Sequence, residues 1–146
     1  VWTVVPLIIV FGLGIVGILT LTGITEAKEN ELVVHVEGFQ WGWTFSYPDD
    51  GEFISADMVL PVDQPARMDM ISKDVVHSFW IPEMRVKQDL VPGQITELRF
   101  TPKVVGEYKL RCAELCGLSH WSMLATVRVV EQAEYDAWLA EKSGGN

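Results

Sequence analysis

The first 25 residues form an uninterrupted apolar run. They are mostly Val, Ile, Leu and Gly, and they contain no Asp, Glu, Lys, Arg or His. At about 1.5 Å per residue the run is long enough to cross a lipid bilayer, and Trp2 suits a membrane–water boundary. A cleaved signal peptide would have a basic leader and a shorter apolar run, and a buried soluble helix would have a polar face. The pattern therefore predicts a transmembrane helix over residues 1–25.

After Thr25 the pattern changes to short segments in which apolar and polar positions alternate, as in β-strands with one buried face. Turn residues such as Pro92 and Gly93 separate these segments. Many short strands with no long helix among them predict an all-β fold, an antiparallel sandwich or a Greek-key barrel. The predicted strands cover residues 31–37, 40–47, 66–71, 95–101, 107–112 and 124–130.

The C-terminal region returns to a helical period. Tyr135, Trp138 and Leu139 are spaced to lie on one face of a short helix over residues 131–142. The chain is therefore expected to consist of a transmembrane helix (residues 1–25), a β-domain (26–142) and a flexible tail (143–146).

The charge lies entirely outside the apolar run. The chain has a net charge of −9, and every charged residue follows Thr25. An acidic domain argues against nucleic acid as a partner and suits a basic protein, although ordinary solubility accounts for the same charge. The net-negative segment over residues 26–29 favours a β-domain outside the cytoplasm.

The segment with most chemical information has the pattern C-x3-C-x3-H-x2-M. It consists of Cys112, Cys116, His120 and Met123, and His77 lies upstream. Thiolate, imidazole and thioether ligands together select copper over hard cations. Four of these residues lie between two predicted strands and His77 lies in a separate predicted loop, so one end of a barrel could gather all five. A second cysteine would let two sulfurs bridge two copper ions, whereas a blue-copper site has one cysteine.

Two other interpretations of the cysteines stay open at this point. A disulfide is common in extracytoplasmic domains, but a bond between Cys112 and Cys116 would close a very short loop and leave His120 and Met123 without a role. A tetrahedral zinc site could use both cysteines with His77 and His120, and Met123 would then have no role.

With the upstream sequence Asp74-Val75-Val76-His77-Ser78, the metal motif resembles subunit II of cytochrome c oxidase. So do Gln40-Trp41-Gly42-Trp43 and the first six residues, and the resemblance runs almost to the C-terminus. It implies a cupredoxin-like Greek-key β-barrel, with one N-terminal transmembrane helix and a short C-terminal helix, that holds a binuclear copper centre called CuA.

The resemblance also implies a role for each site residue. Cys112 and Cys116 would bridge the coppers. His77 and Met123 would complete the coordination of one copper. His120 and the backbone carbonyl of Glu114 would complete the coordination of the other.

Two further roles come from the same family. The Glu114 side chain would reach a magnesium ion at the interface with the catalytic subunit, and Trp41 would receive electrons from cytochrome c. Gly42 departs from the family pattern, which usually has a bulky aromatic residue there, so the docking surface near Trp41 should have a different shape.

The function implied is the electron-accepting subunit of a respiratory haem–copper oxidase. It would take electrons from cytochrome c or another small carrier and pass them to haem in catalytic subunit I, where oxygen is reduced. The resemblance places it in a bacterial plasma membrane or the mitochondrial inner membrane, with the CuA domain on the periplasmic or outer side. The alternatives are a copper-free quinol oxidase subunit, against which the complete ligand set counts, and a membrane-tethered copper-delivery protein, whose metal would exchange readily.

Overall fold

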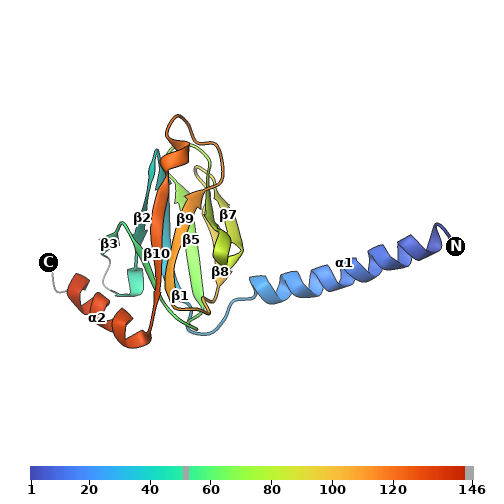
Figure 1. Ribbon diagram of the computed structural model, residues 1–146, viewed down its shortest axis with the longest axis horizontal. Coiled ribbons are helices and arrows are strands. Elements are labelled where there is room, and N and C mark those ends of the chain that lie inside the picture. Colours follow the sequence, from blue (N-terminus) through green and yellow to red (C-terminus); the bar gives the residue numbers. More distant parts are fainter. Residues whose placement is uncertain (51–52, 144–146) are drawn as a thin grey trace.

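The computed structural model describes residues 1–50 and 53–143, and its soluble part is a β-sandwich (Figure 1). Within the described residues the strands form two five-stranded sheets, in the orders β3-β2-β1-β5-β8 and β4-β10-β9-β6-β7. The strands of the first sheet are β1 (Leu32–Phe39), β2 (Gly42–Ser46), β3 (Ile54–Ser55), β5 (Ala66–Ser72) and β8 (Thr96–Phe100). Those of the second are β4 (Met58–Pro61), β6 (His77–Ile81), β7 (Val86–Leu90), β9 (Gly106–Cys112) and β10 (Leu124–Val130).

The core lies between the two sheets and follows the period of two. Along β5, every second side chain is buried, including Ala66, Met68 and Met70. The second sheet contributes fully buried residues such as Phe79 and Leu110. Because successive strand residues face opposite sides, alternation in the sequence becomes one apolar inner face per sheet, and the predicted all-β fold is confirmed.

The topology differs from the prediction in two respects. Each sheet contains one parallel pair, β1 with β5 and β4 with β10, where antiparallel pairing was expected. The sequence pattern also missed β3, β4, β6 and β7. β4 is buried at every position and β7 is largely polar, so neither alternates.

The predicted strand over residues 40–47 is too long at its start. Strands β1 and β2 form a hairpin in which Phe39 pairs with Gly42, so Gln40 and Trp41 are the two turn residues. The peptide bond between Gln40 and Trp41 is cis. The sequence pattern missed this turn because it lacks the Gly, Asn or Asp that usually marks a two-residue hairpin.

The two helices lie at the end of the sandwich away from the loop between β9 and β10 (Figure 1). Helix α1 (Val4–Thr25) extends away from the sandwich, and none of its residues is buried. Helix α2 (Gln132–Ser143) buries Tyr135 and packs Trp138 and Leu139 against the core, as predicted. Ser143 belongs to α2 rather than to the predicted tail, and residues 144–146 lie outside the described residues.

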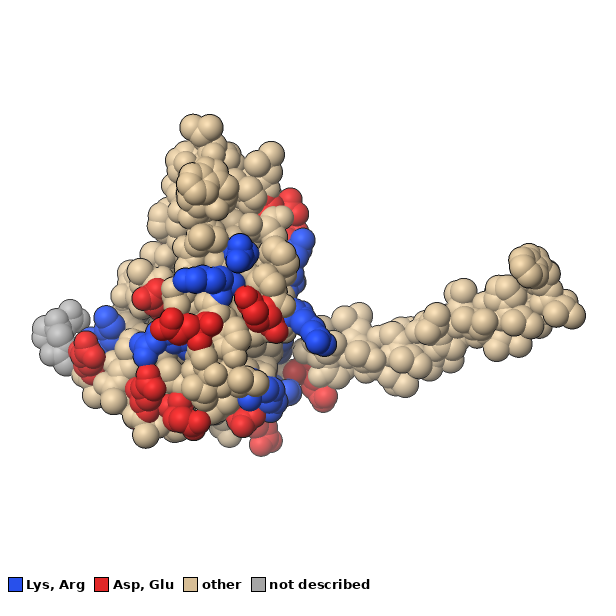
Figure 2. All heavy atoms as spheres, viewed as in Figure 1, with Lys and Arg blue, Asp and Glu red and all other residues tan. Residues whose placement is uncertain are grey.

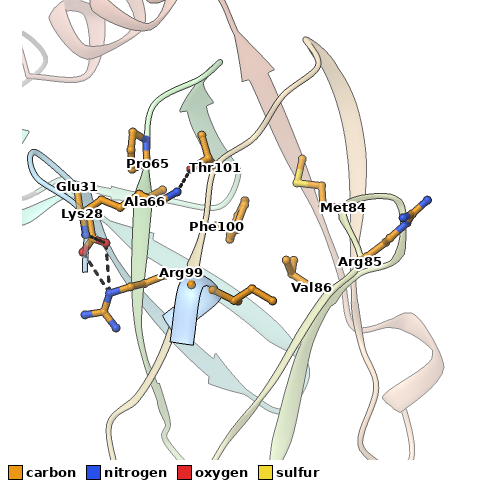
Figure 3. A pocket seen from close by; sticks show the side chains of 12 residues that line it. Lys28, Glu31, Pro65, Ala66, Met84, Arg85, Val86, Arg99, Phe100 and Thr101 are labelled. Carbon is orange, nitrogen blue, oxygen red and sulfur yellow. Dashed lines mark hydrogen bonds and ion pairs between the residues drawn. The ribbon is translucent and has the colours of Figure 1, made fainter. Parts of the chain in front are cut away.

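A pocket of about 340 Å³ lies where α1 meets the sandwich (Figure 3). Ile24, Met84 and Phe100 contribute apolar lining, and at its edge Arg99 forms an ion pair with Glu31. None of the predicted metal ligands lines this pocket. It is a feature of the junction between α1 and the sandwich, not part of the metal motif.

Candidate metal centre

All the predicted ligands except His77 lie in the loop between β9 and β10 or at its ends. This loop lies at the end of the sandwich opposite the two helices (Figure 1). Residues 112–123 are called the ligand loop below. Its two ends are held together because the backbone N–H of Cys112 donates to the carbonyl of Met123 at 3.1 Å. The N–H of Ala113 donates to the carbonyl of Ser78 at 3.0 Å, which ties the loop to β6.

His77 is the first residue of β6, not a loop residue as predicted. β6 pairs with β9, and Phe79 lies opposite Cys112 in that pairing. The His77 side chain is fully buried. Sheet pairing therefore brings His77 beside the cysteines although it is distant from them in the sequence.

The side-chain donors converge on one small volume. The sulfur of Cys112 lies 3.8 Å from that of Cys116 and 3.8 Å from Nδ1 of His77. The sulfur of Cys116 lies 3.5 Å from Nδ1 of His120 and 3.7 Å from Sδ of Met123. The carbonyl oxygen of Glu114 lies 3.2 Å from the Cys112 sulfur. All six predicted ligand residues are thus brought together.

This donor set fits copper. Both cysteines are free thiols, and their 3.8 Å separation is well beyond the roughly 2.05 Å of a disulfide. A structural zinc site is closed by four ligands, whereas two thiols, two imidazoles and the buried thioether of Met123 meet here. Sulfur and imidazole donors in this proportion suit copper, and the ligand atoms of His77, Cys112 and Cys116 lie within 4.8 Å of one another.

Burial raises the pKa of the Cys116 thiol to about 11, and the neighbouring Cys112 thiol adds to the effect. Without a metal the Cys116 side chain is therefore a neutral thiol at neutral pH. Because only the thiolate is a metal ligand, metal binding must release the Cys116 proton.

Asp74 fixes the orientation of the His77 ring, a role that the sequence did not suggest. Its Oδ1 lies 2.7 Å from Nε2 of His77. An Nε2–H that donates to this carboxylate leaves Nδ1 free to face the thiols. Burial would raise the pKa of Asp74, but hydrogen bonds from His77 and from the backbone N–H groups of Gln40 and Val75 outweigh it and lower the pKa.

Trp41 lies at the tip of the β1–β2 hairpin and is 39% exposed, while Trp43 on β2 is only 5% exposed. The Trp41 ring lies against Gly117, where an added Cβ would lie 3.4 Å from the indole Nε1. Of the two neighbouring tryptophans, only Trp41 can meet a partner at the surface while remaining next to the ligand loop.

Gly42 does not leave a gap at this surface. A Cβ at Gly42 would lie 3.1 Å from the Phe39 ring, so the ring of its cross-strand partner covers the glycine. Phe39 is 37% exposed, close to the exposed fraction of Trp41. An aromatic ring is therefore present beside the hairpin tip, but β1 supplies it.

Comparison with known proteins places this architecture in a family. Residues 53–130 match the family described as cytochrome c oxidase subunit II, periplasmic domain. The chain is 42% identical to cytochrome c oxidase subunit 2 of Synechocystis, over 79% of this chain and 34% of that protein. It is 32% identical to the Cereibacter sphaeroides protein, over 99% of this chain and 60% of that protein. The chain thus spans between about one third and three fifths of these relatives' length.

A solved structure agrees with the sequence comparisons. The periplasmic domain of cytochrome oxidase subunit II from Bradyrhizobium japonicum superposes with a TM-score of 0.76 at 30% identity, covering 82% of this chain and 98% of that domain. This likeness confirms the predicted cupredoxin-like fold. With a family match over more than half of its length, the chain belongs to the cytochrome c oxidase subunit II family.

Proposed function

We propose that this chain is the electron-accepting subunit of a haem–copper oxidase and holds a binuclear CuA centre in its ligand loop. The observation that carries the proposal is the convergence of two thiols, two imidazoles, one thioether and one carbonyl oxygen at one end of the sandwich. Such a centre, when bound, takes up and releases one electron with little structural change.

The distances support the central position of the two cysteines, and the division of the other ligands follows the family pattern. Cys112 and Cys116 lie centrally and would bridge the two metals, because each sulfur is within 4 Å of further donors. His77 and Met123 would bind one metal. His120 and the carbonyl of Glu114 would bind the other. Asp74 holds the imidazole of His77 with Nδ1 toward the sulfurs.

Trp41 is the proposed residue that receives electrons from the donor. Its exposed ring and its contact with Gly117, the residue after Cys116, support this role. The donor would be cytochrome c or a similar small carrier, and Phe39 would widen the aromatic surface that this carrier meets.

Helix α1 is proposed to span the membrane. It is 22 residues long, or about 33 Å, against a hydrocarbon core of about 30 Å. The hydroxyls of Thr20, Thr22 and Thr25 donate to backbone carbonyls within the helix, so the helix itself satisfies these polar groups. The sandwich would lie on the periplasmic or outer side, as the acidic segment after the helix favours.

The proposed partner is the haem-bearing catalytic subunit, in which oxygen would be reduced. Glu114 would also face this partner. Its side chain is half-exposed while its carbonyl points at Cys112, so the carboxylate remains available for a magnesium ion at the interface.

Stopped-flow reduction of the copper-loaded chain by reduced cytochrome c tests the proposed electron route. Trp41→Ala should slow the transfer step severely and leave copper content unchanged, since Trp41 supplies no ligand. Trp121→Ala is the matched control, because Trp121 belongs to the ligand loop and is 81% exposed. Wild-type rates in Trp41→Ala, or an equal loss in Trp121→Ala, would contradict Trp41 as the receiving residue.

A further inference from the structure

The tip of the β1–β2 hairpin is hydrogen-bonded to the metal site at two points through one residue, Gln40. Its side-chain Nε2–H donates to the carbonyl oxygen of Cys116 at 2.7 Å. Its backbone N–H donates to Oδ2 of Asp74 at 2.7 Å, while Oδ1 of Asp74 contacts Nε2 of His77. Gln40 is thus one hydrogen bond from a residue predicted to bridge the metals and two from a predicted imidazole ligand.

The same contacts place the Trp41 ring. Gly117 has φ of +121°, a backbone conformation that L side chains rarely adopt. A Cβ there would lie 2.9 Å from Nε2 of Gln40 and 3.4 Å from the indole of Trp41. The Cys116–Gly117 segment therefore lies directly against both turn residues, and the glycine permits this close approach.

We propose that Gln40 is a positioning residue for electron transfer: its side-chain amide holds the Trp41 ring against Gly117 and so fixes the gap between the indole and Cys116. This inference rests on the proposed function of Trp41. It gives Gln40 a role apart from metal binding, since neither of its hydrogen bonds uses an atom predicted to bind metal.

Loss of the Gln40 side-chain amide should change the position of the Trp41 ring and not the stability of the fold. Gln40 is an exposed turn residue, so Gln40→Met keeps the side-chain length at little cost in stability and removes the bond to Cys116. Gln40→Glu keeps the shape but replaces the donor with an acceptor that faces a carbonyl oxygen. Both variants should slow the transfer step by about 10- to 100-fold, as is typical when an outer hydrogen-bond partner of a metal site is removed.

A double-mutant cycle tests the inference. Gln40→Met, Trp41→Ala and the double variant are prepared as full chains in detergent, with Gln132→Met on α2 as the matched control. We expect Gln40→Met to slow transfer alone but to add nothing to Trp41→Ala, because Gln40 acts through Trp41. Copper content and the electron paramagnetic resonance spectrum should stay as in wild type. An equal loss in both backgrounds, or a changed spectrum, would mean that Gln40 acts on the metal site and would overturn the inference.

A second measurement on the metal-free chain is independent of electron transfer. In nuclear magnetic resonance spectra, Gln40→Met should shift the Trp41 indole N–H and the Gly117 amide, and Gln132→Met should leave both in place. Unchanged resonances in Gln40→Met would overturn the positioning role. If Trp41→Ala does not slow reduction, the proposed electron route fails, and the indole shift still decides whether Gln40 positions the ring.

Discussion

At the scale of single residues, the metal site and the surface beside it depend on side chains that are not themselves predicted metal ligands. Asp74 determines which nitrogen of His77 faces the sulfurs, and Phe39 covers the glycine at position 42. Neither role is visible in the sequence. Asp74 looks like any acidic loop residue, and Phe39 occupies a position where the family resemblance directs attention to residue 42.

Asp74→Ala should weaken copper binding. Without the carboxylate the His77 ring can take either tautomer and rotate, so affinity should fall by about 10- to 100-fold. Competition with a copper chelator measures the change, with Asp136→Ala on α2 as the control. An affinity equal to that of wild type would show that burial alone orients His77.

Phe39→Ala tests the aromatic surface beside Trp41. The substitution removes a ring that covers Gly42, and Phe39 is not one of the predicted ligands. We expect the donor concentration at half-maximal rate to rise several-fold while the maximal transfer rate stays near that of wild type. A lower maximal rate with unchanged half-saturation would instead place Phe39 in the transfer step.

At the scale of elements, the ligand loop and helix α1 are the parts that the sequence predicted best. The motif spacing identified the loop. The apolar run identified α1, although the helix begins at Val4 and not at residue 1 as predicted. Strand β6 was missed because His77–Ile81 is buried at four of its five positions and does not alternate. The sheet pairing that brings His77 to Cys112 is long-range, and local periodicity carries no information about it.

Helix α1 should lose membrane insertion when a charge is placed at its middle. Leu13→Arg should cost roughly 3 kcal/mol of insertion free energy, because the arginine would lie near the centre of the hydrocarbon. The matched control is Val104→Arg, at an exposed apolar residue of the sandwich. The fraction of chain retained by membranes after alkaline extraction reports the effect, and equal retention of both variants would argue against a spanning α1.

At the scale of the whole molecule, most of the charge visible on one face of the sandwich lies away from the tip of the ligand loop (Figure 2). On the face shown in Figure 2, acidic and basic side chains gather over the middle and the helix-bearing end of the sandwich, while the ligand-loop end and α1 lack them. The net charge of −9 would act at a distance on a basic electron donor, whereas the proposed contact surface near Trp41 contains exposed aromatic rings. The effect of long-range attraction on the rate of encounter should therefore be separable from the effect of close contact on the transfer step.

Salt should slow encounter with a basic cytochrome c but not the transfer step. Screening acts over about 8–10 Å at ordinary ionic strength, so the second-order rate should fall as salt rises. The rate at saturating donor, once the complex has formed, should stay constant. A second-order rate that does not change with salt would mean that the donor is recognised by apolar contact alone.

The ligand loop, together with His77, is proposed to hold two coppers that share one unpaired electron. The most direct test is the electron paramagnetic resonance spectrum of the copper-loaded full chain, together with its copper content. We expect two coppers per chain and hyperfine splitting from one unpaired electron spread over two copper nuclei, which Cys116→Ser should abolish and Met123→Leu should largely retain. One copper per chain with the splitting of a single nucleus would mean that the site is not a binuclear centre.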